Sequence, residues 1–130
     1  MLRLMRMRHL AVGLGLGLLL SISACAGDDA QDASWWPARA PTPDQRWLAL
    51  MVTETACASG VSPEGRIQPE VTYNTDTIIV TIRVKKLGGA QTCPGIAPTP
   101  YELQLDQPVG NRKVLDGSVT PPSAPRSGPG

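Results

Sequence analysis

Alternation of apolar and polar residues is clearest over residues 77–85. One face of this stretch is apolar and the other is mostly polar, since Ile78, Val80, Ile82 and Val84 alternate with Thr77, Ile79, Thr81, Arg83 and Lys85. A period of two residues is typical of a β-strand with one buried face. The preceding Asn74-Thr75-Asp76 predicts a hairpin turn that joins this strand to another over residues 66–73.

The same pattern predicts three further strands. Residues 47–55 are largely apolar and end in β-branched side chains, residues 101–106 alternate again, and residues 112–117 form a short stretch after a turn. Five strands separated by turn signals, without a convincing helix, predict an all-β domain over residues 46–117. The expected fold is a small antiparallel sandwich or a partly open barrel.

The segments that flank this domain lack an apolar period. Residues 26–34 are small and acidic and three prolines follow them, so a flexible tether is expected over residues 25–45. Ten fully extended residues of such a tether reach about 35 Å. Residues 118–130 are rich in Ser, Pro and Gly and are expected to form a disordered tail. Trp35-Trp36 interrupt the tether, and their indoles either lie at a bilayer interface or pack against the domain.

The first 24 residues have the order of a secretory signal peptide. Three arginines precede an apolar segment over residues 10–20, and small residues follow it. The apolar segment is shorter than the roughly 20 residues that are needed to span a bilayer. Export from the cytoplasm is therefore expected.

Ile22-Ser23-Ala24-Cys25 closely resembles the lipobox of bacterial lipoproteins. The resemblance implies that residues 1–24 are removed, that the Cys25 thiol is diacylglycerylated, and that lipid holds the protein to a bacterial cell membrane outside the cytoplasm. Two or more acyl chains give durable anchoring, which a single chain does not. The alternative is an ordinary signal peptide with a chance cysteine, cleaved after Ala24 or Ala26.

Charge and histidine content narrow the function classes for the mature chain. The signal segment carries three of the 12 Lys and Arg residues and none of the 11 Asp and Glu residues, which leaves a net charge of about −2. No long basic run remains, so a nucleic acid is not an expected partner. The only histidine, His9, lies in the segment to be removed. Histidine-based acid–base catalysis and the usual histidine metal sites are therefore excluded, and no cofactor is expected.

Two cysteines, Cys57 and Cys93, remain after Cys25 is assigned to lipid. Cysteines in an exported chain normally pair, so a disulfide is expected between them. It would stabilise the fold by about 4 kcal/mol in the chain-entropy model. The rival interpretation is a pair of free thiols or half of a metal site.

Residues 56–117 are similar to a group of small exported bacterial proteins of uncharacterised role. The likeness is carried by Cys57-Ala58-Ser59-Gly60, Gly65-Arg66-Ile67, Gln91-Thr92-Cys93-Pro94-Gly95, Thr99-Pro100-Tyr101 and Asp116-Gly117. The resemblance implies a structural cysteine pair in a β domain and supplies no catalytic residue.

These features favour a non-catalytic binding or scaffold module with an envelope protein or polymer as its partner. Recognition usually lies in loops on a rigid β scaffold. The loops here are residues 59–66 and 89–99, and the candidate binding residues are Ser59, Arg66, Gln91, Pro94 and Tyr101.

Two alternative functions stay open. A small extracytoplasmic hydrolase would use a pair of carboxylates or a serine, drawn from Glu54, Ser59, Glu64, Glu70 and Asp76. A protease inhibitor would present the proline-containing stretch 92–95, held rigid by the disulfide.

Overall fold

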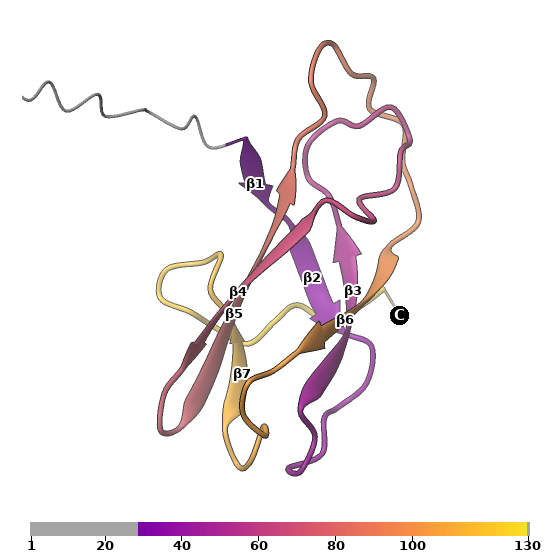
Figure 1. Ribbon diagram of the computed structural model, residues 1–130. Coiled ribbons are helices and arrows are strands. Elements are labelled where there is room, and N and C mark those ends of the chain that lie inside the picture. Colours follow the sequence, from indigo (N-terminus) through magenta and orange to yellow (C-terminus); the bar gives the residue numbers. More distant parts are fainter. Residues whose placement is uncertain (1–28, 130) are drawn as a thin grey trace, which may run out of the picture.

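The computed structural model describes residues 29–129, and the chain there consists of strands and connecting loops (Figure 1). Within this range no helix is long and apolar enough to cross a membrane. The predicted signal peptide and Cys25 lie outside the described residues. The strands are β1 (Ala30–Asp32), β2 (Ser34–Pro37), β3 (Trp47–Thr53), β4 (Ile67–Tyr73), β5 (Thr77–Lys85), β6 (Thr99–Gln104) and β7 (Lys113–Asp116).

The strands form two sheets that pack face to face, as the sequence predicts. One sheet has the order β2-β3-β6, and the other is built around β5. β4 pairs with β5 along one edge, while β1 and β7 follow one another along the opposite edge. The fold is all-β and is not a closed barrel. Residues 29–129 contain seven strands where five are predicted, and β7 runs parallel to β5, which the predicted antiparallel arrangement does not include.

The core lies between the sheets and contains the side chains that the alternation predicts. Residues Ile78, Val80, Ile82 and Val84 of β5 are at most 1 % exposed. They face Leu48, Leu50 and Val52 of β3, and Trp35 of β2 is fully buried beside them. Burying an aliphatic side chain of this size contributes about 1.5–3 kcal/mol. The indole of Trp35 therefore packs in the domain.

The predicted hairpin is present, and β4 is an edge strand. The backbone N–H of Asn74 donates to the carbonyl of Thr77 at 2.8 Å, which closes the turn between β4 and β5. Pro69 lies in β4, whose other edge pairs with no described strand. A proline has no backbone N–H to donate, so it fits an edge strand.

The predicted flexible tether is wrong over residues 30–37, which cross from one sheet to the other. β1 pairs with β5, and the buried Ala33 donates its N–H to the carbonyl of Ile82 at 2.8 Å. β2 then pairs with β3 in the second sheet. β1 consists of small and polar residues and β2 contains two adjacent tryptophans, so neither shows an alternating pattern, and backbone hydrogen bonds to β5 and β3 hold them as strands. We call residues 30–37 the crossing segment.

The predicted disordered tail is instead held against the domain over residues 118–129. Asp116 and Ser123 form an antiparallel bridge, and the guanidinium of Arg126 lies 5.9 Å from the ring centroid of Trp36. Gly128 is also close to this indole, since an added Cβ would lie 2.6 Å from Trp36 Nε1. The tail thus runs from β7 in one sheet to β2 in the other (Figure 1).

Replacing a core residue of β5 should lower the free energy of unfolding far more than replacing an exposed residue of the neighbouring strand β4. We expect Ile82→Ala to lower the free energy of unfolding by about 2–5 kcal/mol, because it leaves a cavity between the sheets. Thr72→Ala, on the exposed face of β4, should change it by less than about 0.5 kcal/mol. Urea unfolding followed by circular dichroism measures both. Equal effects of the two variants would contradict the assigned core.

Candidate functional site

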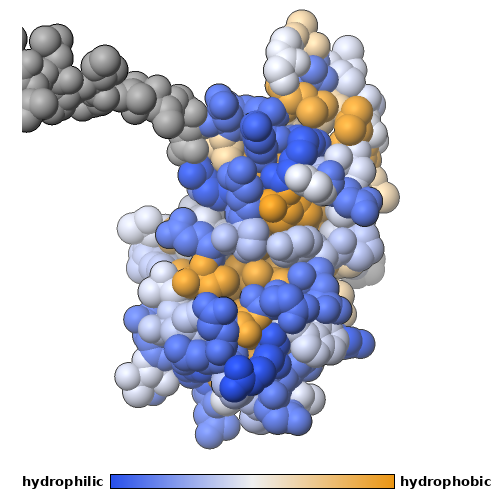
Figure 2. All heavy atoms as spheres, viewed as in Figure 1, coloured by the Kyte–Doolittle hydropathy of each residue, from blue (hydrophilic) through white to orange (hydrophobic). Residues whose placement is uncertain are grey.

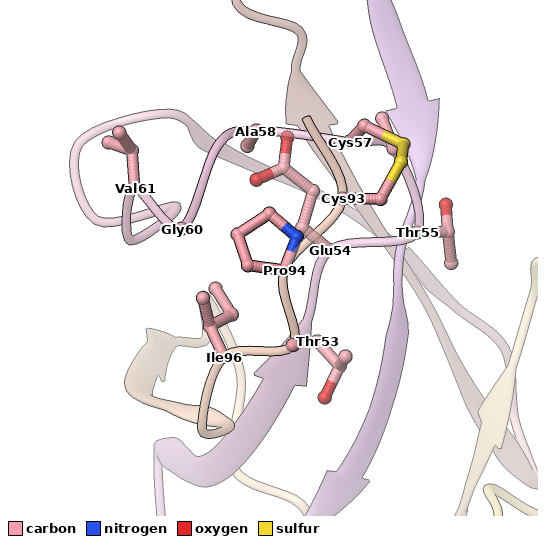
Figure 3. Close-up of a pocket in the computed structure, with 12 residues that line it drawn as sticks. Thr53, Glu54, Thr55, Cys57, Ala58, Gly60, Val61, Cys93, Pro94 and Ile96 are labelled. Atoms are coloured by element: carbon pink, nitrogen blue, oxygen red, sulfur yellow. A yellow bond between two sulfur atoms is a disulfide. The ribbon is translucent and has the colours of Figure 1, made fainter. Parts of the chain in front are cut away.

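Two loops joined by a disulfide lie at one end of the sandwich. Residues 54–66 connect β3 to β4, residues 86–98 connect β5 to β6, and Cys57 is bonded to Cys93 with a Cα–Cα distance of 4.6 Å (Figure 3). The predicted disulfide is thereby confirmed, and the free-thiol interpretation is wrong. We call these two segments the braced loops.

Hydrogen bonds next to the disulfide fix the loops to one another. The N–H of Ser59 donates to the carbonyl of Thr92 at 2.9 Å, and the N–H of Thr92 donates back to Ser59 Oγ at 3.0 Å. Ser59 Oγ donates to Gln91 Oε1 at 2.8 Å. Two of the predicted binding residues, Ser59 and Gln91, therefore contact each other. Their polar groups hold the two loops in register.

Gly60 allows a close approach of the two loops. Its φ is +79°, and an added Cβ would lie 3.3 Å from Cγ of Pro94. A side chain here would meet both an unfavourable backbone conformation and a close neighbour. The exposed Pro94, another predicted binding residue, thus packs over the backbone of the first loop.

Arg66, also among the predicted binding residues, is engaged inside the site. Its guanidinium binds both carboxylate oxygens of Glu54 at 2.7 Å and donates to the carbonyl of Lys85 at 2.7 Å. The Glu54 side chain is only 3 % exposed. The hydrogen bond to Glu54 raises the pKa of Arg66 above its usual value, so the arginine stays charged at every pH of practical interest. The pair closes the base of the braced loops.

A hollow of about 220 Å³ lies between the braced loops. Figure 3 shows Pro94 and Ile96 on one side of it and Glu54, Ala58 and Val61 among the residues from the other loop. The carboxylate of Glu54 is already neutralised by Arg66, which leaves no charged group free in the wall. The hollow can accept a small apolar or neutral group from a partner.

Tyr101, the fifth predicted binding residue, lies in β6 opposite Leu50 and packs against the core. Partial burial raises the pKa of its phenol. It is not part of the hollow. Among residues 29–129, no group of three or more His, Cys, Asp or Glu side chains is placed to hold a metal ion.

A second cavity, of about 290 Å³, opens between the edge strands β2 and β7. Sequence reasoning missed it because much of its wall belongs to the segments predicted to be tether and tail. Its lining consists of Trp35, Pro37, Ala40, Pro41, Leu48, Leu50, Arg112, Val114 and Pro125.

The braced loops lie at the end of the domain where the chain begins β1 (Figure 1). Ala30 is paired with Lys85, the last residue of β5, and the N–H of Lys86 donates to the carbonyl of Asp29 at 2.7 Å. Asp29, where the described chain begins, therefore lies beside the start of the second braced loop.

No family model matches the chain, and comparisons with curated proteins and with solved structures found no match either. The function must therefore be inferred from the geometry described above.

Loss of the disulfide should loosen the braced loops and lower stability. We expect the Cys57→Ser, Cys93→Ser double variant to have a free energy of unfolding lower by about 2–5 kcal/mol, because its unfolded chain is less constrained. Urea unfolding of the oxidised wild type and the variant measures the difference. Equal midpoints for the two proteins would contradict a structural role for the bond.

The Glu54–Arg66 pair provides a second test of the same end of the domain. Glu54→Gln removes the charge that faces a partly buried guanidinium, and we expect it to lower the free energy of unfolding by about 1.5–3 kcal/mol. Glu64→Gln, an exposed change in the same loop, is the matched control and should have an effect below about 0.5 kcal/mol. An equally small effect of both variants would show that the Glu54–Arg66 pair does not stabilise the fold.

Proposed function

We propose that this protein is a lipid-anchored envelope protein whose β domain is a non-catalytic binding or scaffold module. The lipobox resemblance at Cys25 supports the anchor, since acyl chains on this residue would hold the domain to a membrane. The signal segment before it supports a location outside the cytoplasm.

One observation carries the proposal: β1 begins only five residues after Cys25. Five residues span at most about 17 Å when fully extended. A domain anchored through Cys25 would thus stand close to the membrane, and the ten-residue reach expected from the sequence is too long. β1 starts beside the braced loops, so these loops would face the membrane surface.

In this orientation, the two ends of the domain would have different surroundings. The braced loops would meet a partner that is itself held at or just above the membrane. The opposite end carries the hairpin turn at residues 74–76 and the loop over residues 105–112, which lie at the far end of the domain from β1 (Figure 1). That end would be open to the surrounding envelope.

A binding role fits the braced loops better than hydrolysis does. Catalytic carboxylates need a free acid or base near the substrate. The carboxylate that lines the hollow, Glu54, is instead held by two hydrogen bonds to Arg66. A rigid, disulfide-linked loop surface loses little conformational entropy when a partner binds, which favours recognition.

Fractionation of native cells tests the anchor directly. The wild type should be found in the membrane fraction, and Cys25→Ser should move to the soluble extracytoplasmic fraction, because the serine cannot carry the thioether-linked lipid. The Cys57→Ser, Cys93→Ser variant is the matched control and should stay in the membrane fraction. Retention of Cys25→Ser in the membrane would overturn the proposal.

Crosslinking then tests the binding role. A partner captured by the wild type and lost with the Cys57→Ser, Cys93→Ser variant would be expected if the braced loops recognise it. Capture that is unaffected by the double substitution would assign recognition to another surface.

A further inference from the structure

The outermost part of the braced loops contains no charged residue. We define the tip as residues 59–62 and 89–96, which read Ser-Gly-Val-Ser and Gly-Ala-Gln-Thr-Cys-Pro-Gly-Ile. Most of these residues are exposed. Charged residues make up about a quarter of a typical globular protein and lie mostly at its surface. An exposed tip without any charge is therefore suited to an environment less polar than bulk water.

Apolar side chains project from this tip. The side chain of Val61 is 48 % exposed, Ala90 and Pro94 are exposed, and Ile96 is half-buried. Figure 2 shows apolar residues gathered at this end of the domain, over the braced loops. Clusters of exposed apolar groups mark surfaces that contact a partner or a membrane.

The polar groups of the tip are largely paired with one another. The N–H of Ser59 donates to the carbonyl of Thr92, and the N–H of Thr92 donates to Ser59 Oγ. The side-chain amide of Gln91 accepts from Ser59 Oγ and donates to the carbonyl of Gly88. Moving a polar group out of water costs little when its hydrogen bond is kept. These bonds therefore lower the cost of bringing the tip into a less polar medium.

The proposed anchor would hold this tip against the bilayer. Figure 1 shows the braced loops extending past the start of β1. β1 begins five residues after Cys25, and five residues span at most about 17 Å. With acyl chains on Cys25 in the bilayer, the loops that extend past β1 are the part of the described domain that meets the lipid surface.

We propose that the partner of the braced loops is the lipid bilayer itself. Val61, Pro94 and the apolar groups beside them enter the interface between head groups and acyl chains, while the disulfide keeps the two loops together. Because the loops are already held in one arrangement, contact with lipid costs little conformational entropy. The inference rests on the proposed anchor and names the partner of the same site.

The charges behind the tip show which lipids this contact needs. The exposed Lys85 and Lys86 lie at the end of β5, and the exposed acids Asp29 and Glu64 lie in the same part of the domain. Two positive and two negative side chains leave no net charge to attract an anionic surface. The contact is therefore apolar, and neither anionic lipid nor low salt is required for it.

Tryptophan reporters at the two ends of the domain test this contact. The acylated protein is purified from membranes and reconstituted into phosphatidylcholine vesicles, and flotation shows whether it stays attached. Val61→Trp places a reporter in the tip, and Thr75→Trp places the matched reporter in the exposed turn at the other end of β5. The nine residues of β5 separate the two ends by about 30 Å.

Lipid brominated near the head-group end of its acyl chains quenches only an indole that reaches the interface. After subtraction of the emission of the unsubstituted protein, Val61→Trp should be quenched by about twofold or more, because indoles partition into this region. Thr75→Trp should not be quenched. Added anionic lipid or salt should leave both results unchanged.

A charge placed in the tip should abolish the contact. Ala90→Asp, added to Val61→Trp, should remove most of the quenching, since an ionised carboxylate has to stay in water. Thr72→Asp, on the exposed face of β4, is the matched control and should leave the quenching as it is.

Three results would overturn the inference: equal quenching of the two reporters, no quenching of Val61→Trp, or quenching that Ala90→Asp does not reduce. Vesicles that float with the protein but do not quench Val61→Trp would leave the anchor in place and assign the loops to a protein or polymer partner. Protein that does not float would instead reject the anchor itself.

Discussion

The structure depends on the burial of one face of β5. Its four inward aliphatic side chains lie against β3 and Trp35, and its two edges hold β4, β1 and β7. Each buried aliphatic residue contributes about 1.5–3 kcal/mol, so this strand supplies a large part of the apolar stabilisation of a small domain. Because β5 pairs with three strands, its position also sets which loops meet at each end of the sandwich.

The crossing segment attaches the N-terminal end of the domain to both sheets. Residues 30–37 pair with β5 and then with β3, so the start of the domain is attached to both sheets. The same pairing brings the N-terminal end of the described chain beside the braced loops. An anchor at Cys25 would therefore act on a defined end of the domain, close to a disulfide and a nearly buried ion pair. The functional proposal follows from this attachment.

The sequence predicts those elements that depend on a pattern of side chains, such as β5 and the disulfide. The alternation over residues 77–85 matches β5 residue for residue, and two cysteines in a chain that is expected to be exported are enough to predict the disulfide. β1 and β2 were missed because backbone hydrogen bonds to other strands hold them and their sequences, three small or polar residues and a segment with two adjacent tryptophans, show no alternation. The tail was missed for a similar reason, since it is held by a backbone bridge and by one arginine over one indole.

The candidate sites were predictable only in part. Ser59, Gln91 and Pro94 were placed correctly in the two loops, but their contacts with one another depend on how the loops pack. The second cavity could not be found from the sequence, because residues from β2, β3, β7 and the tail form it together. The unpaired N–H of the buried Trp35 has no sequence signature either.

Amide hydrogen exchange along the crossing segment tests the central claim most directly. The N–H of Ala33, within this segment, donates to the carbonyl of Ile82, and the N–H of Ala38, directly after the segment, donates to the carbonyl of Ala49, both at 2.8 Å. If this segment joins the two sheets, these amides should exchange about as slowly as those of β3, because they open only when the sandwich opens. Exchange at the rate of an unstructured chain would contradict the account, since it would restore a free tether and remove the fixed orientation of the braced loops.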